Sequence, residues 1–234
     1  MIEVNTNKGI SGKTKVADLV NMNFHLLGVL SRLGIKPGFG EKSLSDVCAG
    51  KGLDEAALLV ICKVYVFDDF IPSAEDLDPV KIEDIIRYLR LSHRYYMDSA
   101  LVVLEEALSK MLAPCQDSRK KVIWKFFLDY KEELRRHFEY EEGTVFPYAE
   151  GLKDGSAERP GSIEDISDGH SSIEEKIDDL KNILMRYLPA DCDASDIDGT
   201  LLYIFFLEKE LQRHTAIEDK VLSPMINRLS GYGN

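Results

Sequence analysis

Four of the chain's five histidines form two pairs with the same internal spacing. The members of each pair are 44 residues apart, and the second pair repeats the first after 77 residues. The pairs are His93 with His137, and His170 with His214. The later histidine of each pair has a glutamate four residues further on, Glu141 or Glu218, on the same helix face. This repeated set of imidazoles and carboxylates is typical of a metal site with nitrogen and oxygen ligands.

A helical pattern of apolar residues surrounds each histidine. Such residues recur every three or four positions over four ranges, which predicts four long helices. The ranges are about 80–112, 118–149, 162–188 and 197–229. Seven inward-facing positions of the second range have counterparts 77 residues later in the fourth, which indicates an internal repeat of a helix pair. They are Phe127, Tyr130, Leu134, His137, Glu141, Val145 and Tyr148. The breaks between the ranges favour an all-α, up-down-up-down four-helix bundle.

The chain before this bundle predicts a small helical module. Thr14 is placed to cap a first helix that ends at Gly34, and Ser43 with Asp46 resembles a capping box. Asp54 is placed to cap a third helix that reaches about residue 67. We therefore expect three parts: a three-helix module, an acidic linker rich in proline, and the bundle. Their predicted ranges are 1–67, 68–79 and 80–234.

Composition narrows the classes of partner. The net charge of −12 argues against nucleic acid or an anionic membrane surface as the main partner. No apolar run approaches the ~20 residues that span a bilayer, and the first fifteen residues do not resemble a signal peptide. We therefore expect a cytoplasmic protein whose cysteines are separate and reduced. These cysteines are Cys48, Cys62, Cys115 and Cys192.

The metal hypothesis depends on where the glutamates lie. Each of the four paired histidines falls within the apolar stripe of its own helix, so all four should point into the bundle core. Ionised Glu141 and Glu218 would be costly there without a cation, and no lysine or arginine occupies these stripes. The alternative is a set of hydrogen-bonded core histidines without metal. His25 has no glutamate four residues on and is expected at the surface, while Glu174 is a candidate extra ligand or a salt-bridge residue.

The number of ligands indicates two metal ions. If both glutamates bridge, the six side chains supply about eight bonds, whereas two octahedral ions take about twelve. A bridging oxo or hydroxo group would add two and leave open positions. Imidazole with carboxylate suits iron, and zinc and manganese remain alternatives.

At this point the residues resemble the hemerythrin-like di-iron proteins. Within them the chain is similar to the repair-of-iron-centres family, which joins a small N-terminal helical module to a hemerythrin-like bundle. The most specific segments are His93, His137-Phe-Glu-Tyr-Glu141, His170 and His214-Thr-Ala-Ile-Glu218. The resemblance implies that these six residues hold two non-haem iron ions in an oxo- or hydroxo-bridged centre, with the glutamates bridging. Oxygen-carrying hemerythrins have a further histidine that this chain lacks, which implies a more open centre.

The resemblance also covers the N-terminal module, with one departure. The matching segments begin at Thr14, Ser43 and Gly52. The family usually has cysteine in the loop after the first helix, but residues 35–39 contain none. Any role that depends on thiols in this loop therefore does not transfer to this chain.

The resemblance implies a part in the response to nitrosative and oxidative stress. Its expected chemistry is repair of damaged iron–sulfur clusters, nitric oxide reduction at an open di-iron site, or both, with iron–sulfur client proteins as partners. One alternative is a protein that binds or senses oxygen or nitric oxide without turnover. Another is an interaction scaffold whose iron serves mainly for folding. The sequence does not choose among these alternatives and gives no oligomeric state.

Overall fold

The fold is helical throughout the part of the chain that the computed structural model describes. The described residues are 9–153, 155, 164–192 and 194–231. Among them the only β-type pairing is an isolated bridge between Lys15 and Ser43. The all-α fold predicted from the sequence is confirmed. The predicted first residues of the third long helix, 162 and 163, lie outside the described residues.

The chain divides into two compact units whose boundaries fall within long helices. The first contains residues 1–91 and 216–234, and the second contains residues 92–215. The domain boundaries expected from the sequence remain a prediction.

Four short helices begin the first unit. They are α1 (Val16–Met22), α2 (Leu26–Arg32), α3 (Leu44–Lys51) and α4 (Glu55–Val66). Two of the three predicted caps are present: Ser43 and Asp46 form a reciprocal capping box, and the Asp54 carboxylate accepts the backbone N–H of Ala57. Both satisfy donors that a helix start leaves without partners. The predicted Thr14 cap is wrong, because the Thr14 hydroxyl accepts the Ser11 N–H and α1 begins after Lys15 without a side-chain cap. Farther along, α5 (Ala74–Leu77) lies within the acidic segment, and Asp76 of this helix pairs with Lys63 of α4.

The predicted first helix is instead two helices, α1 and α2. The break lies at Asn23, whose side-chain oxygen accepts the His25 backbone N–H and whose side-chain amide donates to the Tyr65 carbonyl. An asparagine side chain that bonds to nearby backbone competes with helical hydrogen bonding, which explains the interruption. The expectation for His25 is also wrong. This histidine is the N-cap residue of α2, is only 8% exposed and stacks on the Phe24 ring.

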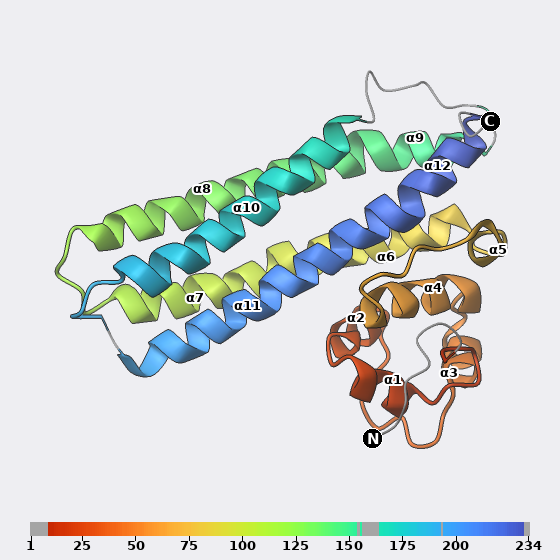
Figure 1. Ribbon diagram of the computed structural model, residues 1–234, viewed down its shortest axis with the longest axis horizontal. Helices are drawn as coiled ribbons and strands as arrows, with labels where there is room; N and C mark the ends of the chain where they lie inside the picture. The colour runs from red at the N-terminus through yellow and green to blue at the C-terminus, as the bar shows by residue number, and fades with distance from the viewer. Residues whose placement is uncertain (1–8, 154, 156–163, 193, 232–234) are drawn as a thin grey trace. The chain divides into compact units, whose positions relative to one another are not determined.

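The second unit is a four-helix bundle (Figure 1). Its first helix runs from the end of α6 (Ile82–Tyr95) through η1 (Tyr96–Ala100) into α7 (Leu101–Leu112). The second is α8 (Arg119–Tyr140), continued by η2 (Glu141–Val145) and α9 (Phe146–Gly151). The third is α10 (Glu164–Tyr187), and the fourth is α11 (Ala194–Ile217). Beyond this unit, α11 continues as η3 (Glu218–Leu222) and α12 (Ser223–Leu229).

Contacts between helices show that neighbours are antiparallel. Arg119 at the start of α8 bonds to Tyr187 at the end of α10, whereas Glu133 later in α8 bonds to Ser172 earlier in α10. The same reversal relates the first bundle helix to α11. Lys110 of α7 bonds to Asp196 at the start of α11, and Ala100 at the end of η1 bonds to Tyr203 later in α11. Short connections join α7 to α8 and α10 to α11. The up-down-up-down arrangement is therefore confirmed.

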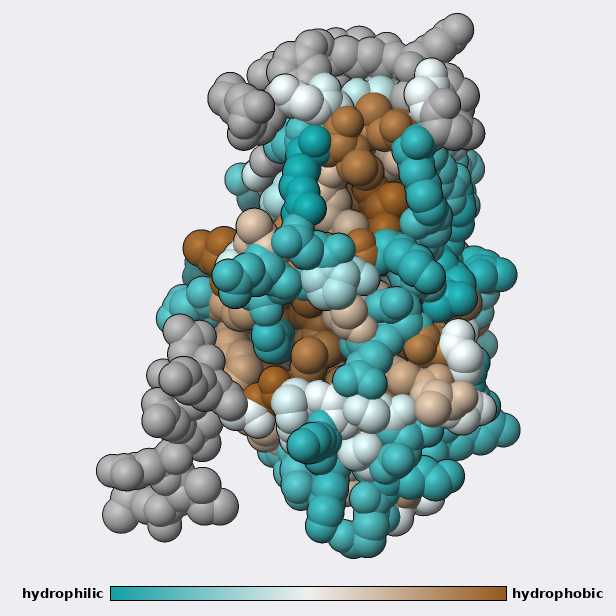
Figure 2. Space-filling view, turned by 90° about the vertical axis from the view of Figure 1, so that its right-hand side faces the viewer, coloured by the Kyte–Doolittle hydropathy of each residue, from teal (hydrophilic) through white to brown (hydrophobic). Residues whose placement is uncertain are grey.

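A continuous apolar core fills the bundle. All four helices contribute buried side chains to it, as expected when each presents one apolar stripe. The largest include Phe127, Tyr130, Leu104, Leu180 and Leu207. On the face drawn in Figure 2, hydrophobic surface remains visible between hydrophilic side chains. Among the described residues no helix combines the length and apolarity needed to cross a membrane.

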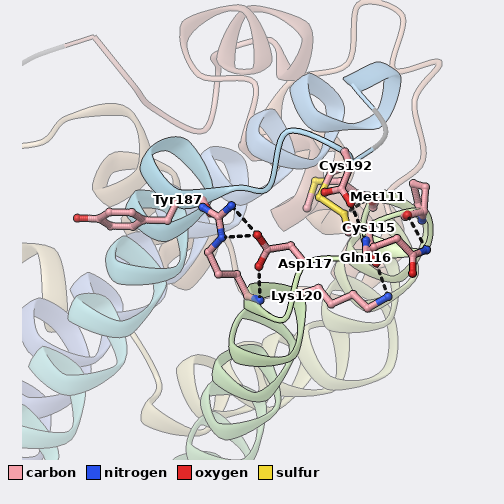
Figure 3. The surroundings of a disulfide bond; sticks show 10 residues. Met111, Cys115, Gln116, Asp117, Lys120, Tyr187 and Cys192 are labelled. Atoms are coloured by element: carbon pink, nitrogen blue, oxygen red, sulfur yellow. Dashed lines mark hydrogen bonds and ion pairs between the residues drawn. A yellow bond between two sulfur atoms is a disulfide. The ribbon is translucent and has the colours of Figure 1, made fainter.

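One end of the bundle carries a disulfide between Cys115 and Cys192 (Figure 3). The expectation of four separate, reduced thiols is therefore wrong for this pair. Cys115 follows α7 and Cys192 follows α10, so the bond ties the two connections together. The remaining cysteines, Cys48 and Cys62, are buried free thiols. Burial raises their pKa values, to about 11 for Cys48 and about 12 for Cys62, so neither is a reactive thiolate.

Candidate metal centre

Each bundle helix contributes one histidine to a common cluster. His93 lies near the end of α6, His137 in α8, His170 in α10 and His214 in α11. Three of the four are almost completely buried, and the His137 side chain is 9% exposed. The rings form two edge-to-face pairs, His93 with His214 and His137 with His170, each with ring centroids 5.0 Å apart. In the 77-residue repeat His93 corresponds to His170 and His137 to His214, so the two spatial pairs are equivalent.

Glu141 lies among three of these rings. Its Oε1 is 3.1 Å from His137 Nε2 and 3.5 Å from His170 Nε2, while its Oε2 is 3.3 Å from His93 Nε2. The carboxylate is 1% exposed, and neither oxygen receives a hydrogen bond of normal geometry. A buried carboxylate arranged in this way has both oxygens available for a cation.

The charge state of Glu141 follows from opposing effects. Burial raises the pKa of its carboxyl, but interactions with His137, His170 and His93 outweigh burial and hold this pKa well below its usual value. Glu141 is therefore an anion in the bundle interior.

A carboxylate outside the cluster orients His93. Glu142 Oε1 lies 3.0 Å from Nδ1 of His93, on the side of the ring away from Glu141. When the Nδ1–H group of His93 donates a hydrogen bond to Glu142, the ring is neutral and Nε2 carries a free lone pair. That Nε2 is 3.1 Å from His214 Nε2, in the interior of the cluster. Glu142 therefore stabilises the tautomer that a metal-binding histidine requires.

The side chains fall into two groups that share their glutamates. One group contains His93 and His214, the other contains His137 and His170, and Glu141 and Glu218 belong to both. Within each group the potential ligand atoms all lie within 4.8 Å of one another. Glu218 follows His214 by four residues, at the start of η3 on the same continuous helix. Two histidine nitrogens and two carboxylates per group are a donor set that fits iron, zinc or manganese.

Wide helical turns begin at both glutamates. Both η2, which starts at Glu141, and η3, which starts at Glu218, are π-helical segments. In η2 the Phe146 N–H donates to the backbone carbonyl of Glu141, and in η3 the Ser223 N–H donates to that of Glu218. A proline of the repeat follows each of these two turns, whereas the π-turn η1 has Val102 at the corresponding position. Pro147 and Pro224 lack an N–H, so neither can bond to the carbonyl four residues before it. Single π-turns of this kind often occur at functional sites.

Aromatic rings enclose the His93–His214 pair. The Phe138 ring stacks on His93 with centroids 4.0 Å apart, and Phe146 stacks on the same histidine at 5.5 Å. The Tyr96 ring contacts His214 edge-on, with ring centroids 5.4 Å apart. Its hydroxyl donates a hydrogen bond to the backbone carbonyl of Glu210. These rings fix the imidazole planes and exclude water from this side of the cluster.

Two residues illustrate what sequence reasoning missed or left open. Glu142 was not predicted to act on a histidine, although its counterpart in the repeat, Asp219, is also acidic and hinted at a common role. Glu174 is half-buried on α10 and does not belong to either group of potential ligands. Its position therefore supports a role outside the cluster.

Fold and site together define a helical bundle protein with a buried histidine–carboxylate centre. The profile of the hemerythrin HHE cation binding domain matches residues 84–226, which is more than half of the chain. The chain belongs to this hemerythrin family. A comparison with curated proteins found no match.

Proposed function

We propose that the protein holds two non-haem iron ions between its four histidines. In this proposal His93 with His214 binds one ion, His137 with His170 binds the other, and both glutamates bridge. The observation that carries it is the sharing of Glu141 and Glu218 by two groups of potential ligands. The assignment of these six residues as ligands is part of the proposal. Family membership supports iron, and the donor types agree with it.

The proposed activity is chemistry on small diatomic ligands in nitrosative or oxidative stress. Two adjacent irons with open positions would supply electrons and coordination sites to nitric oxide or oxygen. The chain's own residues prepare this centre. Glu142 holds the proton on Nδ1 of His93, and Phe138 and Phe146 shield that ring from water. The similarity to the repair-of-iron-centres family extends the proposal to iron–sulfur client proteins. Because residues 35–39 contain no cysteine, the bundle centre would have to perform that chemistry.

Nitric oxide is the substrate with which to test the activity. Reduced, iron-loaded protein mixed with nitric oxide without oxygen should change its absorption spectrum and release nitrous oxide. The balance is two nitric oxide molecules, two electrons and two protons giving one nitrous oxide and one water. Gas chromatography measures the product, and a Glu141→Ala variant is the control.

The same experiment separates turnover from binding. A spectral change that reverses when nitric oxide is removed, with no nitrous oxide, would support the alternative of a binding or sensing protein. If the iron-loaded protein shows no spectral change, both proposals are wrong.

Glu142→Gln should weaken metal binding without altering the fold. Glutamine lacks the carboxylate charge that stabilises the Nδ1 proton of His93, so this ring becomes a poorer ligand. Loss of such an outer partner typically costs about 10- to 100-fold in metal affinity or activity. Competition with a coloured chelator measures the change. Glu139→Gln on the same helix is the matched control, because Glu139 pairs with Arg135 at the surface. Equal affinities for the two variants would contradict the role of Glu142.

A further inference from the structure

The disulfide occupies equivalent positions of the internal repeat. Cys115 and Cys192 are 77 residues apart, the same step that relates His93 to His170. The repeat therefore brings one thiol from each half to the same end of the bundle. About 30 Å of helix separates His93 from this end, at 1.5 Å per residue along α6, η1 and α7. The cysteine pair is thus independent of the histidine cluster.

Asp191 completes a third group of potential metal ligands. A carboxylate oxygen of Asp191 and the two sulfur atoms lie within 4.8 Å of one another. The Gln116 backbone N–H donates to Asp191 Oδ2 over 2.6 Å, which holds the carboxylate beside the sulfurs. Figure 3 shows Gln116 next to this disulfide. Carboxylates that bind metals are oriented by hydrogen bonds of this kind.

Nearby cations already have other partners. The Lys120 ammonium donates a hydrogen bond to the backbone carbonyl of Cys115, and the Arg119 guanidinium forms an ion pair with Asp117. The Cys115 sulfur is also 3.8 Å from the Met111 carbonyl. The three candidate ligands are therefore grouped where the two connections meet. The hydrogen bonds of Lys120 and Arg119 go to groups other than the two sulfurs and the Asp191 carboxylate, although the Arg119 charge also acts on Asp191.

We infer that Cys115, Cys192 and Asp191 form a second metal site, for a thiophilic divalent cation such as Zn²⁺, which opens when the disulfide is reduced. A dithiol reductant would supply two electrons and two protons and would itself become a disulfide. Binding of the cation then displaces one proton from each thiol. Two thiolates and one carboxylate give three protein ligands of a tetrahedral zinc ion, with water as the fourth. Disulfide and metal are alternative states of the same pair.

Cobalt(II) distinguishes this site from the histidine cluster. Bound to thiolate it gives a sulfur-to-cobalt charge-transfer band, which ligands of nitrogen and oxygen alone do not give. Reduced full-length protein whose histidine cluster is already loaded with iron, titrated with cobalt, should show this band, saturating at one cobalt per chain. Iron-loaded protein with the disulfide intact should not show the sulfur-to-cobalt band. The absence of the band in protein whose free thiols have been counted would overturn the inference.

Two variants and a matched control test the ligands. Cys192→Ser should abolish the band; a band that persists would come from other thiols and would overturn the inference. Asp191→Asn should weaken cobalt binding at least tenfold. Unchanged affinity would show that the Asp191 carboxylate is not a ligand. Asp117→Asn is the control, because this aspartate lies in the other of the two connections, near Cys115, and pairs with Arg119. Helical circular dichroism of each variant confirms that the bundle is folded.

Discussion

Glu141→Ala should leave fewer than one metal ion per chain, against about two in the unaltered protein. Glu141 contacts histidines of both groups, so its loss removes a ligand from both proposed positions at once. His137 belongs to only one group, so His137→Ala should lose about one ion and keep the other. This difference follows from the shared carboxylate and is not expected if each position has its own ligands. Mass spectrometry of tag-free protein measures the metal content.

His25→Ala is the matched control for these variants. His25 is buried, as the cluster histidines are, but it begins α2 and stacks on Phe24. Its variant should therefore keep the full metal content. Full occupancy in both Glu141→Ala and His137→Ala would show that the ligand assignment is wrong. Two ions retained in Glu141→Ala alone would show that this glutamate does not bridge.

Reducing the Cys115–Cys192 bond should lower the free energy of unfolding of the bundle by about 4 kcal/mol. The bond closes a loop of 77 residues, and a cross-link of that span removes conformational entropy from the unfolded chain. Denaturant unfolding of the same protein with and without a thiol-specific reductant measures the change through helical circular dichroism. The expected result is a lower midpoint in the reduced sample.

The variant with both cysteines replaced by alanine separates this effect from other actions of the reductant. Without the cross-link its unfolding should not respond to reductant. A response as large as that of the unaltered protein would show that the reductant acts elsewhere, for example on the metal centre. If both proteins are insensitive, the disulfide does not constrain the unfolded chain.

Much of the fold and the cluster could be predicted because the sequence repeats itself. The 77-residue step and the apolar stripes indicate four helices and an inward histidine on each, which depends only on helical periodicity. The caps at Ser43 and Asp54 could also be predicted, because a capping residue and its target are only three residues apart in both cases.

The errors arose where a residue's role depends on contacts distant in sequence. His25 was expected at the surface, yet it is buried in a segment where Asn23 bonds to the Tyr65 carbonyl, 42 residues away in sequence. The bond between Cys115 and Cys192 joins two connections, and only the repeat step hinted at it. The role of Glu142 arises from a contact with His93 on another helix, 49 residues away in sequence.

The cross-link between the two connections also makes the chain covalently circular between Cys115 and Cys192. A protease that cuts the backbone once anywhere within this circle opens the ring but releases no fragment. The two pieces stay attached through sulfur, and after a cut between α9 and α10 each piece retains one of the two repeated helix pairs. Under oxidising conditions a nicked molecule can thus hold all four histidines together, whereas the same cut under reducing conditions leaves only non-covalent packing to join the halves.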